Sequence, residues 1–242
     1  MKKLSINSSL AVVAAATFLM FASAAQAVIV PVGLNPGDTY HLVFVTSGGR
    51  DATSSDIDDY NDFVQAQAAL SPAITGTDLG VEYLAIASTA TVDAIDNAPI
   101  SGPVYLTDGT TLVATGSADM WDGFLLNTLN KTQYGGIHTE DHVWTGTLGN
   151  GLKGGAGNPG NLYLGSTVPP VVGAGVNTHT TSLWTEGTFF SPDNILALYA
   201  ISEPLSVPVS AVPEPSTYAM ALIAVLGLGL YGRRRHRSTP VQ

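Results

Sequence analysis

The chain contains 242 residues, no cysteine and only 12% charged side chains. Between Val28 and Val212 it carries 18 aspartates and glutamates but only three basic residues, Arg50, Lys131 and Lys153. This acidic excess argues against nucleic acid as a partner, because phosphate binding requires clusters of basic side chains. The lack of cysteine excludes thiol catalysis and cysteine-ligated zinc.

The first 27 residues have the three parts of a secretory signal peptide. Lys2 and Lys3 form a positive start, and residues 10–21 form an apolar stretch. The segment "ASAAQA" then supplies small residues at Ala25 and Ala27 for cleavage after Ala27. This pattern predicts export and removal of residues 1–27, so we expect the domain that begins at Val28 to lie outside the cytoplasm.

The exported domain, predicted over residues 28–203, opens with a strand and a helix. Residues 39–47 alternate apolar and polar side chains, which indicates a strand. Ser55 and Asp58 have the spacing of a capping box, and we predict a helix over residues 56–70. Its apolar positions are Ile57, Tyr60, Phe63, Val64 and Leu70. We expect this face to pack on a sheet that contains Leu42, Phe44 and Val143.

The next elements are predicted to be short. Residues 82–88 read as a strand, and Ser88 or Thr89 would cap a short helix over residues 91–97. Residues 104–114 form two short apolar segments around Asp108-Gly109, which predicts a hairpin with a type I′ turn. Further strands are expected at residues 142–148, 182–188 and 195–202, with a glycine-rich loop over residues 150–160. The proline-rich residues 204–212 would form an extended tether. One main helix, a short second helix, antiparallel strands and long loops define an α+β fold.

Two polar clusters are candidates for metal binding. In "HTEDH", a helix would place His138 and His142 on one face with Glu140 and Asp141 nearby, as a zinc site requires. The zinc-protease order His-Glu-x-x-His is absent, and the neighbouring glycines and β-rich "VWTGT" favour a solvated loop that enters a strand. The acidic segment at residues 56–62 leaves calcium open as a cofactor. Its alternative interpretation is an acidic first turn stabilised by the helix dipole.

Trp121 lies between Asp119 and Asp122 in the segment "ADMWDG". A tryptophan with polar neighbours can be an exposed platform for a sugar or a packed core residue. The pattern favours the packed side chain.

The C-terminal segment looks like a short membrane anchor. Residues 217–231 are apolar, and 15 residues form about 22 Å of helix, less than the roughly 30 Å of a bilayer core. A basic group follows at Arg233, Arg234, Arg235 and Arg237. Arginines beside an apolar segment hold that end in the cytoplasm, so we predict one transmembrane helix of marginal length.

The tripeptide Pro213-Glu214-Pro215, the apolar segment and the arginines together resemble the PEP-CTERM sorting signal of exopolysaccharide-producing Gram-negative bacteria. The resemblance covers residues 213–237. It implies that exosortase, a membrane enzyme, processes the chain near the tripeptide. The chain would then be held only transiently in the inner membrane before it reaches the cell surface or extracellular matrix.

Segments of the exported domain, among them "YHLVFVTSGGRDATSSDIDDYNDFVQAQA", "AIASTATVDAIDN" and "LYAIS", are similar to bacterial extracellular domains of the C-type-lectin-like and endostatin-like fold. That fold implies that the last strand returns to pair near the first. The lectins' calcium signature, Glu-Pro-Asn with a later Trp-Asn-Asp, is not present, and neither are their disulfides.

We therefore expect a non-catalytic binding or adhesion module of the cell surface or biofilm matrix, with exopolysaccharide or another surface glycan as its partner. The alternative is an extracellular metal-dependent hydrolase that acts on matrix polysaccharide. The residues His138, Glu140, Asp141 and His142 are the support for that alternative.

Overall fold

The computed structural model describes residues 28–76, 80–155, 161–168 and 170–209. The predicted signal peptide, with its expected cleavage residues Ala25 and Ala27, and the predicted sorting signal and transmembrane segment lie outside the described residues. The first compact unit ends at Val207, four residues beyond the boundary that we predicted at residue 203. Among the helices of the described residues, none has the length and apolar character needed to cross a bilayer.

A nine-stranded mixed sheet organises the described part of the domain, in the order β4-β3-β1-β8-β5-β6-β7. Strand β2 also pairs with β8, and β9 pairs with β1. The strands are β1 (Thr39–Val45), β2 (Tyr83–Ala85), β3 (Val104–Leu106), β4 (Leu112–Ala114), β5 (His142–Trp144), β6 (Val172–Val176), β7 (Thr188–Phe190), β8 (Ala197–Ser202) and β9 (Leu205–Ser206).

The last long strand, β8, is the centre of this sheet. It pairs antiparallel with β1 along one edge. Along the other edge it pairs antiparallel with β2 and parallel with β5. Strand β9 continues along β1, with Tyr40 opposite Leu205. The expected return of the last strand to the first is therefore confirmed. Strands β1 and β3, and β5 and β8, pair in parallel, so the sheet is mixed rather than wholly antiparallel.

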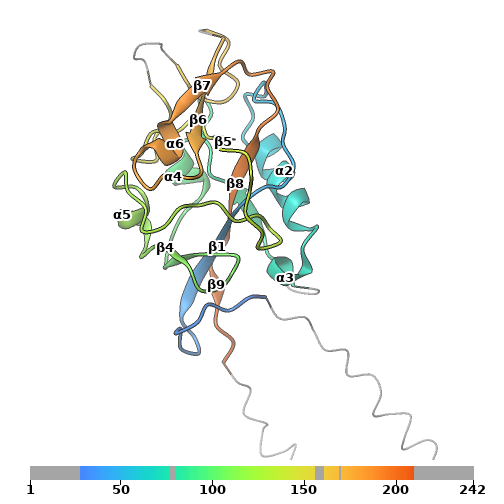
Figure 1. Cartoon of the computed structure of the whole chain (residues 1–242), viewed down its shortest axis with the longest axis vertical. Coiled ribbons are helices and arrows are strands. Elements are labelled where there is room, and N and C mark those ends of the chain that lie inside the picture. The colour runs from blue at the N-terminus through green and yellow to red at the C-terminus, as the bar shows by residue number, and fades with distance from the viewer. Residues whose placement is uncertain (1–27, 77–79, 156–160, 169, 210–242) are drawn as a thin grey trace, which may run out of the picture. The chain divides into compact units, whose positions relative to one another are not determined.

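Helices cover the two sides of the sheet unequally (Figure 1). The main helix α2 (Asp58–Ala68) and the short α3 (Pro72–Thr75) lie on one side, which we call the helix face. Three single-turn helices, α4 (Ala94–Asn97), α5 (Ser117–Met120) and α6 (Leu183–Glu186), lie with long loops on the other, the loop face.

Strand alternation divides the core between these faces. On β1, Leu42 and Phe44 point to the helix face and Val43 to the loop face. On β5, Trp144 packs in the helix-face core. The predicted contact between the helix and Val143 is wrong, because Val143 is one residue out of phase with Trp144 and belongs to the loop-face core.

Helix α2 is confirmed, but its predicted start is wrong. The capping box does not form: the N-cap is Ile57, and Asp56 Oδ1 rather than Ser55 accepts the Asp58 N–H at 3.1 Å. The helix ends at Ala68, just before Ser71-Pro72, because a proline disfavours helical backbone at the residue before it. Leu70 lies beyond the helix and is 54% exposed.

The second helix and the hairpin differ from prediction in their turns. The N-cap of α4 is Asp93, although Ser88 Oγ accepts the Ala94 N–H at 2.9 Å. The β3–β4 hairpin forms, but its turn is not type I′, which needs positive φ at both central residues. Of Asp108 and Gly109, only Gly109 has a positive φ (69°). The Asp108 carboxylate instead accepts the N–H groups of Thr110 and Thr111.

The segment 182–188 is not the predicted strand. It forms α6 and then enters β7 at Thr188. Its alternating apolar residues resembled a strand, but Trp184 is instead buried in the loop-face core, where it stacks near Trp121 and Tyr199. Tertiary packing of one large side chain has overridden the local pattern.

Candidate functional site

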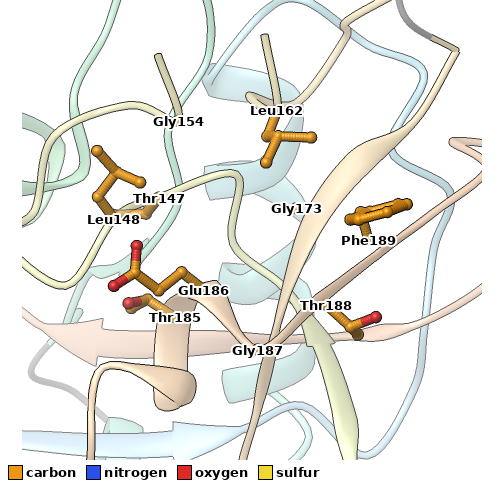
Figure 2. Close-up of a pocket in the computed structure, with 10 residues that line it drawn as sticks. All are labelled: Thr147, Leu148, Gly154, Leu162, Gly173, Thr185, Glu186, Gly187, Thr188 and Phe189. Carbon is orange, nitrogen blue, oxygen red and sulfur yellow. The ribbon is translucent and has the colours of Figure 1, made fainter. Parts of the chain in front are cut away.

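A hollow of about 340 Å³ opens on the loop face beside β6 and β7 (Figure 2). In Figure 2 the Glu186 carboxylate and the Leu148 side chain lie on one side of it, and Phe189 and Leu162 lie on the other. Its lining consists of short polar, apolar and glycine residues around one carboxylate: Thr147, Leu148, Gly154, Leu162, Gly173, Thr185, Glu186, Gly187, Thr188 and Phe189.

A second hollow of about 380 Å³ adjoins the first. The two share Leu148 and Glu186, so Glu186 lies at the boundary between them. We call the two adjoining hollows together the Glu186 groove. The remaining residues that line the second hollow are Asp122, Gly123, Phe124, Gly149, Asn150 and Ser182.

Close packing of α6 on β6 positions Glu186. A Cβ at Gly175 would lie 1.8 Å from the Trp184 carbonyl oxygen, so only glycine permits this approach. Thr145 Oγ1 donates a hydrogen bond to the Thr185 carbonyl at 2.5 Å, which ties α6 to the residue that follows β5. Glu186, the last residue of α6, is thus attached to a buried base while its own side chain stays exposed.

Strand β7 presents one aromatic ring to the groove and buries the next. Phe189 is 48% exposed and lies opposite Gly173 of β6. Phe190 points to the other side and packs edge-on against Trp144 and His142. At the other hollow, Phe124 is 63% exposed, so each hollow carries an accessible ring.

The polar side chains of the groove are two carboxylates, several hydroxyls and the amide of Asn150. Asp122 Oδ1 accepts the Phe124 N–H at 2.8 Å, which holds the turn at residues 122–124. The Glu186 carboxylate has no hydrogen-bond or ion-pair partner among the residues that the structure describes. No lysine or arginine is among the described residues that line either hollow. Apolar rings beside a few fixed polar groups are typical of sites for small ligands.

The four residues proposed for zinc are placed in different surroundings. His138 Nδ1 lies 2.8 Å from the Glu140 carbonyl oxygen and 3.0 Å from Asn177 Nδ2. His142 is the first residue of β5 and packs edge-on against Phe190 at 5.0 Å. Asp141 is exposed, and its carbonyl accepts the Asn177 N–H. The segment is a loop that enters a strand, as one of the two interpretations expected.

In the acidic segment at residues 56–62, two carboxylates bind the start of α2 and the loop before it. Asp56 Oδ1 accepts the Asp58 N–H at 3.1 Å, and Asp59 Oδ2 accepts the Ser54 hydroxyl at 2.6 Å. Within the described ranges, no group of three or more histidine, aspartate or glutamate side chains has a geometry that could hold a metal ion.

Trp121 is a packed residue, as the sequence favoured. It is 7% exposed and lies in the loop-face core, 5.8 Å from the Trp184 ring. The loop at Gly151 lies directly on it, since a Cβ there would meet the indole at 2.8 Å. Trp121 therefore supports the groove from below, and its neighbour Asp122 lines it.

The comparison with known families concerns the C-terminal part of the chain. Residues 211–235 match the PEP-CTERM protein-sorting motif. The match includes the tripeptide Pro213-Glu214-Pro215 and the first three arginines of the basic group, and ends before Arg237. The protein is thus an exported, cell-surface-associated substrate of exosortase. No curated protein matches the chain significantly.

Sequence reasoning did not find Glu186 or Phe189, because Glu186 lies in the segment interpreted as a strand and Phe189 directly follows that segment. One signal was available. Glu186 is the only charged residue between Gly154 and Pro192.

Proposed function

We propose that the exported domain is a non-catalytic binding module that holds a glycan of the cell surface or biofilm matrix in the Glu186 groove. The main support for this proposal is the groove itself: two adjoining hollows, each with an exposed phenylalanine, share one exposed carboxylate. The flat apolar faces of sugar rings can pack on such aromatic rings, while ring hydroxyls donate hydrogen bonds to carboxylate and threonine oxygens.

A C-type-lectin-like fold is part of this proposal. The antiparallel pairing of β1 with β8 and β9, the one main helix after the first strand and the long loops on one face support it. Loops on a rigid sheet are a common place for binding sites, and the groove lies among such loops.

The module is proposed to act without metal-dependent hydrolysis. His138 is held by Glu140 and Asn177, and His142 packs on Phe190, so neither presents a ring nitrogen to the Glu186 groove in this arrangement. Measuring the release of reducing ends from matrix polysaccharide, with added zinc or calcium, tests this part. Metal-dependent release that disappears in His138→Ala would contradict it.

The binding test is a glycan array probed with the full-length chain in detergent micelles. Phe189→Ala should weaken binding of the captured glycan about tenfold, because a stacked aromatic ring contributes roughly 1 kcal/mol or more. Tyr134→Ala is the matched control, since Tyr134 is 60% exposed but does not line the groove. Absence of any captured glycan, or equal loss in both variants, would contradict the proposal.

For sorting, we propose cleavage close to the tripeptide Pro213-Glu214-Pro215, after which the apolar segment and its arginines remain in the membrane. The matched motif at residues 211–235 supports this. The intact mass of protein released from exosortase-containing cells should lack Arg233 to Arg237. A mass that retains them would show that the released chain keeps its tail.

A further inference from the structure

We propose that the Glu186 groove selects amino sugars with free, protonated amines, in preference to acetylated or acidic sugars. This inference rests on the proposed glycan binding and specifies its ligand class. It follows from the charges that line the groove and from the location of every basic side chain in the exported domain.

The groove contains two carboxylates and no basic group to balance them. Glu186 lines both hollows and Asp122 lines the second. Only three basic residues exist between Val28 and Val212, and the structure describes all of them. Whether a positive charge offsets the two carboxylates of the groove therefore depends on where these three side chains lie.

Each basic side chain is engaged elsewhere. Lys153 is next to the lining residue Gly154, but its Nζ donates to the Ala90 carbonyl at 3.0 Å. Lys131 Nζ lies 3.9 Å from Asp108 Oδ2. The Arg50 guanidinium lies 4.3 Å above the Tyr60 ring on the helix face.

An uncompensated negative groove in a domain with 18 acidic residues repels uronates and other anionic sugars. A neutral sugar avoids the repulsion but leaves the carboxylate without an ionic partner. A protonated amine can give Glu186 a charge-assisted hydrogen bond, which is stronger than a neutral one. The amine form is therefore the form that the groove binds best.

The shape of the groove favours a sugar chain over a basic peptide. Each hollow is near the lower limit of ligand-pocket volumes, so it suits one small ring at a time. The accessible Phe189 and Phe124 offer a ring face in each hollow. Glu186, at the boundary, can be reached from a ring in either one, whereas a lysine side chain would use the carboxylate and leave the aromatic faces uncovered.

The test measures binding of four probes to the full-length chain in detergent micelles by calorimetry at low salt. The probes are a glucosamine hexamer, an N-acetylglucosamine hexamer, a galacturonate hexamer and a lysine hexapeptide. Glu186→Gln removes the charge and keeps the size. Glu203→Gln is the matched control, because Glu203 is exposed, follows β8 and lies outside the groove.

We expect the glucosamine hexamer to bind most tightly, and its binding to weaken as salt is added. Glu186→Gln should weaken it about fivefold, the upper range for an exposed ion pair. The same variant should leave the acetylated hexamer unchanged, and Glu203→Gln should leave all affinities unchanged.

Other outcomes are distinguishable. Equal binding of the acetylated and free hexamers, with no effect of Glu186→Gln, overturns the amine selection but supports the glycan site. Tight binding of the galacturonate hexamer overturns the charge argument. Binding of the lysine hexapeptide without any sugar overturns both this inference and the proposed glycan function.

Discussion

The two faces of the sheet treat the polar atoms of their aromatic residues differently. On the helix face, the hydroxyl groups of Tyr40, Tyr60 and Tyr83 donate to the carbonyls of Ile29, Ser54 and Ile74. On the loop face, Trp121 Nε1, Trp184 Nε1 and Tyr199 OH are buried and have no hydrogen-bond partner among the described residues.

Because of this difference, we expect the helix face to contribute more to stability than the loop face. A buried polar group without a partner costs about 1–3 kcal/mol, whereas a satisfied one contributes modestly. The helix face is therefore the better-satisfied half of the core. The loop face includes single-turn helices, glycine contacts and unpaired ring atoms, and it is the face that carries the Glu186 groove.

The largest expected effect is on the helix face. Tyr60→Ala should lower the free energy of unfolding by about 4 kcal/mol, because Tyr60 is fully buried and its ring is lost together with a hydrogen bond. Phe63→Ala on the same helix should cost less, about 1–2 kcal/mol, since Phe63 is only partly buried. Urea unfolding measures both, and equal costs would show that burial does not rank these positions.

Gly175→Ala, on the loop face, should lower the free energy of unfolding by about 3 kcal/mol, since a Cβ would displace the backbone at Trp184. Binding at the groove should fall with it, because α6 carries Glu186. Gly155→Ala is the control, as its nearest contact would be 4.0 Å away. Retained glycan binding in folded Gly175→Ala protein would disconnect the groove from this packing.

Removing one hydroxyl from each face gives a direct comparison. Tyr83→Phe should cost about 1 kcal/mol, because it leaves the buried Ile74 carbonyl without its donor. Tyr199→Phe should be neutral or slightly stabilising, because the Tyr199 hydroxyl has no protein partner among the described residues. Thermal unfolding of the two variants checks this. A larger loss for Tyr199→Phe would reverse the contrast between the faces.

The fourth effect appears only on acidification. His41 is buried; its Nδ1 donates to the Ser202 carbonyl at 2.8 Å, and its Nε2 accepts the Ser101 N–H at 3.1 Å. Burial lowers the pKa of His41, although the bond to Ser202 opposes this. The unfolded chain therefore binds a proton more readily, so the stability due to neutral His41 is complete above about pH 6.5 and declines as pH falls below it.

Urea unfolding at a series of pH values should show this decline, and His41→Gln should reduce it. His179→Gln is the matched control, because it removes an exposed histidine and keeps His41 in place. An unchanged acid dependence in the His41 variant would assign the decline to other groups.

The sequence predicted those parts of the fold that local pattern determines. Strand β1, helix α2, the β3–β4 hairpin and strand β8 each have periodicity or turn residues over a sufficient length. The face on which Val143 lies was missed, because it depends on the register between β5 and β8, where Val143 is opposite Ala197. One residue of register reverses a face, and no local signal specifies it.

The candidate site was less accessible to prediction for the same reason. Glu186 belongs to a single-turn helix that packs on Gly175 and is held by Thr145, which is 40 residues from its partner Thr185. The partner of His41 is still more distant along the chain, since Ser202 is 161 residues away. By contrast, the sorting motif at residues 211–235 was predictable because its information is contiguous.

The position of β8 has a consequence for the order of events during export. The predicted signal peptide would take the chain across the membrane from its N-terminus, so β8, which joins β1, β2 and β5, would be among the last segments to arrive. Strand β9 ends at Ser206, only a few residues before the motif at 211–235 begins. We therefore expect the sheet to close only as the sorting motif reaches the membrane, so that completion of folding and presentation to exosortase would fall at nearly the same moment.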